Sequence, residues 1–196
     1  MSGDGNTAIV GALLAVPADA WVFTRTGQMW SLQAELPAPD PSDSALSDSN
    51  PISISYDGNT LVFGADLAQK AWVYSRVNGV RGKPSMLAPG VGSSDFGVSV
   101  AISSDGGTIM VGADTDNNGA GAVWVYTRAN GNWVLQGGKL VAAGAMGPAL
   151  FGAGVALSAD GNTAVIAGAN DNFSPTASGA VWVFVRSNGQ WSQQGV

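Results

Sequence analysis

The side chains best suited to chemistry in this sequence are the oxygen donors of Asp114-Thr115-Asp116-Asn117-Asn118-Gly119. Alternating oxygen side chains followed by glycine are typical of the first half of a calcium loop, because calcium prefers hard oxygen ligands and glycine permits a sharp turn. The acidic residue expected later in such a loop is absent, since Ala120 to Val123 follow. The candidate calcium ligands, including those of a shorter run at Asn170-Asp171-Asn172, are Asp114, Asp116, Asn118, Asn170 and Asp171, with Asp66 weaker. The alternative is a solvated polar loop.

Histidine and cysteine are both missing from the 196 residues, which excludes several reaction classes. There can be no Ser-His-Asp triad, no cysteine nucleophile and no zinc or haem site built on imidazole or thiolate. We therefore expect no zinc, haem or nucleotide cofactor. The formal net charge of -6 comes without a cluster of Lys and Arg, so nucleic acid is not an expected partner. Cations and neutral surfaces suit the chain better.

The candidate calcium ligands are positioned by a sequence motif that recurs four times. The hexapeptide Ser-x-Asp-Gly-(Asn/Gly)-Thr occurs at 2–7, 55–60, 103–108 and 158–163. Each copy leads into a short apolar run, then into Trp-Val-(Phe/Tyr)-x-Arg, a glycine-containing turn and a final apolar segment. An apolar segment also precedes the hexapeptide, and the Asp-Gly pair that follows it predicts a tight hairpin. Short runs rich in aromatic and β-branched residues, separated by Gly, Asn and Asp, indicate strands.

Each repeat is therefore predicted to be a four-stranded antiparallel meander of about 50 residues, the size of a propeller blade. We expect an all-β protein with a single β-propeller domain, whose repeats cover approximately 1–47, 48–95, 96–150 and 151–196. The first repeat lacks its first strand, so fifteen strands are expected and closure of the ring is imperfect. The chain then forms a complete ring with a deficient first blade, a partial ring, or a homo-oligomer in which another copy completes the ring.

The repeat also resembles a known family. Phe-Gly-x-x-Val-Ala-(Leu/Ile)-Ser-x-Asp-Gly-x-Thr, then Val-Gly-Ala, then Trp-Val-(Phe/Tyr)-x-Arg-x-Asn-Gly-x-Trp resembles the bacterial FG-GAP repeats, relatives of the propeller repeats of integrin α subunits. The resemblance spans essentially the whole chain and is strongest in the third and fourth repeats, whereas the second has Asp48-Ser49 in place of Phe-Gly. It implies an extracellular or cell-surface scaffold that presents loops to a protein or glycan, with calcium ordering them.

A meander sorts its charges onto two faces. The hairpin face carries the repeated acids and arginines Asp4, Asp57, Asp105, Asp160, Arg25, Arg76, Arg128 and Arg186. There we expect each aspartate to cap its own turn and each arginine to pair with it or with a neighbouring carboxylate, the alternative being a ring of arginines for an anionic ligand. The acidic loop face carries Asp19, Asp40, Asp43, Asp48, Asp66, Asp95, Asp114, Asp116 and Asp171, with Lys70 and Lys139. That face should attract cations and basic partners.

The aromatic residues are predicted to be mainly structural. The pairs Trp21 and Trp30, Trp124 and Trp133, and Trp182 and Trp191 each flank one hairpin, so packing explains them better than ligand stacking does. Phe96 and Phe151 are repeat positions and are expected in the core. Phe173 has no counterpart in other repeats, which makes it the aromatic candidate for ligand contact.

Two classes of function fit these observations. The first is an extracellular or cell-surface ligand-binding or adhesion module that is stabilised by calcium and acts through the acidic loop face. The second is a calcium-dependent propeller hydrolase of an ester, lactone or phosphate, since a cation held by carboxylates and amides needs no histidine. A purely structural repeat unit is a third reading.

Location is predicted by the resemblance alone. The first residues show no signal-peptide pattern. No membrane span is expected, because the longest weakly polar stretch, 141–157, contains Pro148 and four glycines. The resemblance to the FG-GAP repeats implies a secreted or cell-surface protein.

Overall fold

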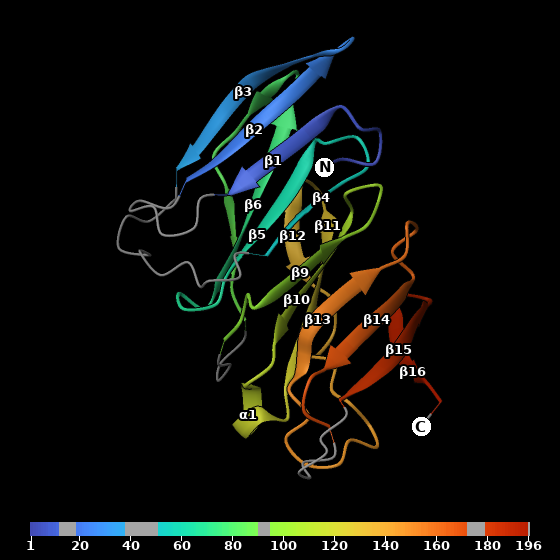
Figure 1. The fold of residues 1–196 in the computed structure, drawn as a ribbon. Coiled ribbons are helices and arrows are strands. Elements are labelled where there is room, and N and C mark those ends of the chain that lie inside the picture. The colour runs from blue at the N-terminus through green and yellow to red at the C-terminus, as the bar shows by residue number, and fades with distance from the viewer. Residues whose placement is uncertain (12–18, 38–50, 90–94, 172–178, 196) are drawn as a thin grey trace.

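The structure is a computed structural model that describes residues 1–11, 19–37, 51–89, 95–171 and 179–195. Four antiparallel sheets follow one another along the chain, one for each repeat (Figure 1). The first sheet, in blue, and the fourth, in orange to red, lie at opposite ends of the arrangement. This confirms the predicted all-β propeller architecture.

The strands of the first two sheets follow the repeat. The first sheet has the order β1 (Thr7–Gly11), β2 (Asp19–Thr26), β3 (Met29–Pro37), and within the described residues it has no counterpart of the first strand, as predicted. The second sheet consists of β4 (Ile52–Ile54), β5 (Thr60–Ala65), β6 (Lys70–Val77) and β7 (Val80–Arg81), with β8 (Ser85–Leu87) also paired to β6. The division of its outer segment into β7 and β8 makes sixteen described strands in place of the fifteen expected.

The third and fourth sheets each have four strands. The third comprises β9 (Ser99–Ile102), β10 (Thr108–Ala113), β11 (Ala122–Ala129) and β12 (Asn132–Leu135), with the short turn α1 (Asp116–Gly119) between β10 and β11. The fourth comprises β13 (Phe151–Leu157), β14 (Thr163–Gly168), β15 (Ala180–Ser187) and β16 (Gln190–Gln194).

The hexapeptide forms the same turn in every repeat. In the second repeat, Ser55 Oγ donates to Asp57 Oδ1 at 2.6 Å, and the Asn59 N–H donates to the same oxygen at 2.9 Å. The Thr60 N–H in turn donates to Ser55 Oγ at 3.0 Å. Equivalent bonds occur in the other three repeats. The prediction that the aspartate caps its own turn is confirmed, and the turn sets one strand register for all four sheets.

That common register places equivalent side chains on equivalent faces. The tryptophan of each Trp-Val motif pairs with the same position of the preceding strand: Val10 with Trp21, Phe63 with Trp72, Val111 with Trp124, and Ile166 with Trp182. We call the face toward the preceding sheet the leading face and the face toward the following sheet the trailing face. Because of this register, the interface between one pair of consecutive sheets is lined by the same repeat positions as the interface between the next pair.

Consecutive sheets pack face to face, and three apolar clusters fill the spaces between them. The predicted core role of the Phe-Gly phenylalanines is confirmed. Phe96 lies edge-on to Trp124 with ring centroids 5.6 Å apart, and Phe151 lies edge-on to Trp182 at 5.4 Å. Both phenylalanines are fully buried. The phenylalanine of one sheet thus fills the core that it shares with the preceding sheet.

The glycine after each phenylalanine permits this close approach. Gly152 has φ +99°, and a Cβ there would lie 2.6 Å from the Ala122 carbonyl oxygen. A Cβ on Gly112 would lie 2.1 Å from the Gly152 carbonyl oxygen. No apolar cluster of the described residues joins the first sheet to the fourth, so this part of the chain forms an open arc.

Candidate functional site

Three aspartates lie near one another on the acidic loop face where the second and third sheets adjoin, since the charges of Asp95 and Asp66 both act on Asp114. Asp66 follows β5, Asp114 follows β10, and Asp95 precedes the core residue Phe96. Burial raises the pKa of Asp114, and the nearby charges of Asp95 and Asp66 raise it further. We call Asp66, Asp95 and Asp114 the aspartate cluster. A carboxyl group whose pKa is raised by burial and by like charges is a recognised mark of a functional site.

The members of the aspartate cluster differ in how their oxygens are used. Asp66 is only 9% exposed, and its Oδ1 makes no hydrogen bond. Asp95 accepts a hydrogen bond from Thr115 Oγ1 at 2.8 Å. A buried carboxylate oxygen without a hydrogen-bond donor is costly, so it favours a cation nearby. Sequence reasoning named Asp66 and Asp114 as ligand candidates but placed Asp95 only on the acidic face, because Asp95 lies in a linker.

Asp116, the other carboxylate of the candidate calcium loop, is engaged elsewhere. Its side chain is fully buried in α1 and forms an ion pair with Lys139 from the linker after β12. Asn117 and Asn118 both adopt left-handed backbone conformations, with φ of 52° and 58°, and are exposed. The candidate loop therefore contributes Asp114 to the aspartate cluster and Asp116 to a separate ion pair.

Asn170 and Asp171, two further candidate ligands, form hydrogen bonds with the linker that precedes β13. Asn170 Nδ2 donates to the Pro148 carbonyl at 3.2 Å, and Asp171 Oδ1 accepts from the Met146 N–H at 2.7 Å. These contacts join the end of β14 to the segment that leads into β13. The predicted ligand contact Phe173 lies outside the described residues.

The aspartate cluster meets only some of the requirements of a metal site. Within residues 1–11, 19–37, 51–89, 95–171 and 179–195, no three or more acidic side chains are arranged to hold an ion directly. The donor set of the aspartate cluster is nevertheless all oxygen, which suits calcium, and calcium accepts backbone carbonyls and waters as further ligands.

The hairpin-face arginines bind polar groups of their own turns or of the neighbouring sheet. Arg76 Nε donates to Asn59 Oδ1 at 2.8 Å and Arg186 Nε to Asn162 Oδ1 at 3.0 Å, so their partners include the asparagine of the hexapeptide. The third repeat has Gly107 at this position, and there Arg128 donates to Ser75 Oγ at 3.1 Å. The expected pairing is thus structural, but these bonds go to amide and hydroxyl groups rather than carboxylates.

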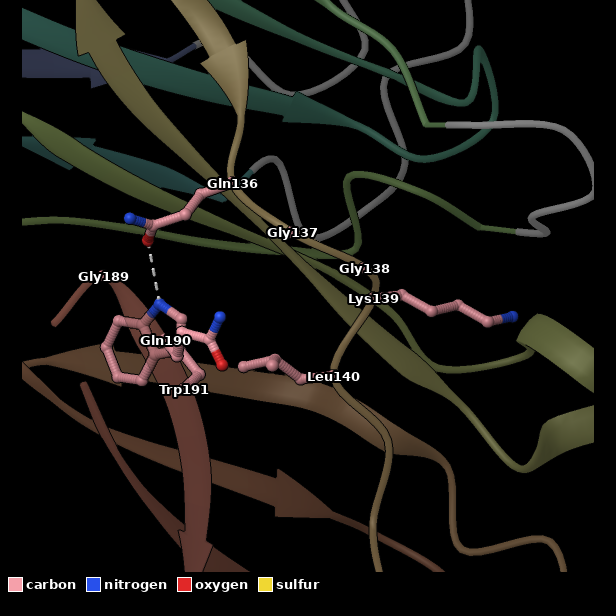
Figure 2. A pocket seen from close by; sticks show the side chains of 8 residues that line it. All are labelled: Gln136, Gly137, Gly138, Lys139, Leu140, Gly189, Gln190 and Trp191. Carbon is pink, nitrogen blue, oxygen red and sulfur yellow. Dashed lines mark hydrogen bonds between the residues drawn. The ribbon is translucent and has the colours of Figure 1, made fainter. Parts of the chain in front are cut away.

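A groove that sequence reasoning missed lies between the third and fourth sheets. It encloses about 470 Å³ and is lined by Gln136, Gly137, Gly138, Lys139, Leu140, Gly189, Gln190 and Trp191. Figure 2 shows the segment 136–140 on one side and the β15–β16 turn on the other, with Trp191 Nε1 donating to Gln136 Oε1 at 3.0 Å. The two sides come from different repeats, so no sequence pattern could have identified the groove.

The comparisons with known proteins agree on the fold. No protein-family model and no curated protein matches this chain. Among solved structures, a functionally unknown protein from Desulfotomaculum acetoxidans is 17% identical with a TM-score of 0.67, and the match covers 100% of this chain and 53% of that one.

Two further solved structures match with similar scores. The periplasmic gluconolactonase of Pseudomonas aeruginosa is 19% identical with a TM-score of 0.62, covering 98% of this chain and 54% of that one. Hydrazine synthase from Kuenenia stuttgartiensis is 16% identical with a TM-score of 0.61, covering 99% and 47%. At these identities the matches show the fold, which is that of a β-propeller. The chain spans about half the length of these structures.

The described part of the chain includes no helix long and apolar enough to cross a membrane.

Proposed function

We propose that this chain is a ligand-binding propeller module that takes up calcium at the aspartate cluster. The observation that carries the proposal is the buried Asp66 carboxylate, whose Oδ1 lacks a hydrogen bond, close enough to Asp114 to raise its pKa. A divalent cation would compensate both groups at once. The three carboxylates would have to move closer together, and water or carbonyl oxygens would have to complete the calcium shell.

The position of the aspartate cluster supports a role in ligand binding. Its three residues lie in loops at one end of two sheets, and such loops tolerate variation on a fixed scaffold. A cation bound there would order the β5–β6 and β10–β11 loops and would lower the repulsion among the carboxylates. The ligand class that fits is a protein or glycan that contacts the ordered loops. An extracellular or cell-surface location fits the resemblance to FG-GAP repeats.

Calorimetric titration with calcium chloride, beside thermal unfolding in calcium and in chelator, tests the proposal. We expect wild-type protein to bind calcium and to unfold at a higher temperature in its presence, because a ligand that binds only the native state stabilises it. Asp66→Asn and Asp114→Asn should lose both effects. Glu35→Gln, which removes one exposed negative charge on β3, is the matched control and should retain them. A calcium-induced shift that persists in Asp114→Asn would show that the ion binds elsewhere.

The alternative is a calcium-dependent hydrolase that acts through the same cluster. Asp114 favours it, because a carboxyl group whose pKa is raised by burial is the kind of group that serves as a general acid or base. The gluconolactonase among the similar structures makes a lactone the first substrate to try. Calcium-dependent lactone turnover that is lost in Asp114→Asn would favour the hydrolase, whereas calcium binding without turnover would favour the binding module.

A further inference from the structure

The trailing face of the fourth sheet is exposed although its counterparts in the inner sheets are buried. Val165, Val181 and Val183 are 42%, 62% and 36% exposed. The equivalent residues of the third sheet are Met110, Val123 and Val125, and those of the second are Val62, Ala71 and Val73. All six have at most 1% exposure. The strand register establishes the equivalence, since Val165 pairs with Val183 as Met110 pairs with Val125.

The leading face of the first sheet lies at the other end of the arc, and no described sheet packs against it. Val10 is 53% exposed, and Trp21 and Phe23 are half-buried. In the fourth sheet the equivalent residues are Ile166, Trp182 and Phe184, all buried in the cluster that they form with the third sheet. The first sheet therefore presents the same aliphatic and aromatic side chains that fill the internal interfaces.

The internal interfaces show that these two kinds of face are complementary. In each of them, aliphatic residues of a trailing face, joined by Met110 in the third sheet, meet aromatic and aliphatic residues of the next leading face. The cluster between the first and second sheets joins Ala20 and Val22 to Tyr74, with Phe63 and Trp72 packed against it. The valines of the fourth sheet and the aromatic residues of the first are chemically equivalent to these partners.

Backbone hydrogen bonds between the hexapeptide turns end at the same boundary. The Asp4 N–H donates to the Tyr56 carbonyl, the Tyr56 N–H to the Ser104 carbonyl, and the Ser104 N–H to the Ala159 carbonyl, each at 3.0 Å. The Ala159 N–H, which is next in this series, has no backbone partner among the described residues. A further turn of the same kind would complete the series.

We propose that the trailing face of the fourth sheet docks the leading face of the first sheet of a second copy of this chain. Two copies related by a two-fold axis would make this contact twice and would place eight sheets in one ring. Eight blades is within the range of known propellers, whereas three copies would exceed it. The solved structure of the functionally unknown protein from Desulfotomaculum acetoxidans is about twice as long as the part that this chain matches, which is consistent with two copies per ring.

The mass of the purified 196-residue chain, measured by light scattering after size exclusion at micromolar concentration, tests this proposal. We expect a mass of twice 19.7 kDa for the wild type. Val181→Asp should be a folded monomer, because the substituted side chain is exposed in the single copy and buried only in the dimer. Val77→Asp, on the β6–β7 hairpin with 65% exposure, is the matched control and should remain dimeric. Circular dichroism establishes that each variant is folded.

Val10→Asp separates the head-to-tail arrangement from the alternatives. Val10→Asp alters only the leading face of the first sheet. It should also give a monomer, because each proposed contact joins the leading face of one copy to the trailing face of the other. A dimer that survives Val10→Asp but not Val181→Asp would mean that two trailing faces meet, which overturns the proposal. A wild-type mass of 19.7 kDa would also overturn it and would leave the face for further repeats of a longer polypeptide.

Discussion

Lys139 forms an ion pair with Asp116 across the space between the linker after β12 and the turn α1. The Asp116 side chain is 1% exposed, whereas that of Lys139 is 39% exposed and lies 5.6 Å from the centre of the Trp124 ring. Asp116 looked like a metal ligand in the sequence, but in the fold a lysine neutralises it. The pair holds the linker after β12 against the loop between β10 and β11.

Removal of Lys139 should destabilise the protein. Lys139→Met leaves the buried Asp116 carboxylate without its counter-charge, and we expect a loss of about 2–3 kcal/mol of unfolding free energy by urea denaturation. The double variant Asp116→Asn, Lys139→Met should recover part of that loss, because the buried charge is gone. Lys83→Met, at an exposed position, is the control and should have little effect. Equal losses in Lys139→Met and Lys83→Met would show that the ion pair contributes nothing.

Asp114→Asn should stabilise the protein in chelator at neutral pH. The pKa of Asp114 is raised in the fold, so its favourable contribution is present below the ordinary pKa of 3.8 and is lost as the pH rises through the folded value. At pH 7 the carboxylate therefore costs stability. Because the group is half-exposed, we expect a gain below about 1 kcal/mol, or at most about 2–4 °C in the unfolding midpoint. A lower midpoint in chelator would contradict the inferred repulsion within the aspartate cluster.

Gly152→Ala should be far more damaging than Gly131→Ala. Both glycines have positive φ, +99° and +82°, but a Cβ on Gly152 would lie 2.6 Å from the Ala122 carbonyl oxygen, whereas nothing lies within 4 Å of one on Gly131. Gly131→Ala should cost about 1 kcal/mol for backbone strain. Gly152→Ala should cost about 3 kcal/mol or more, because two sheets must also separate. Similar urea midpoints for the two variants would mean that the sheets can move apart freely.

Acid should weaken the hexapeptide turns. Hydrogen bonds from the Ser158 hydroxyl and the Asn162 N–H lower the pKa of Asp160 below its ordinary value of 3.8. A lowered folded pKa contributes stability that is present above pH 3.8 and is lost as the pH falls through the folded value. The difference between urea midpoints at pH 7 and pH 3 should therefore be smaller in Asp160→Asn than in the wild type. An unchanged difference would show that the turn does not respond to ionisation of this aspartate.

Much of the fold was predictable because its signals are local and repeated. The spacing of Ser158, Asp160 and Thr163 defines a turn that closes within six residues, and the alternation of apolar residues on either side sets the strands. Repetition of the pattern also revealed the missing first strand of the first sheet. The division of the second repeat's outer segment into β7 and β8 was not predictable, because that repeat departs from the common pattern there.

Less of the candidate site could be predicted. The sequence by itself determined the repeat, the strand register, the capped turns and the excess of aspartate on one face, since each depends on residues close together in the chain. Only the tertiary structure decided which carboxylates are neutralised and which are crowded. Lys139 reaches Asp116, and Asp66 approaches Asp114, because neighbouring elements pack there. The exposure of Val181 was likewise decided by packing, since the same repeat position is buried wherever another sheet covers it.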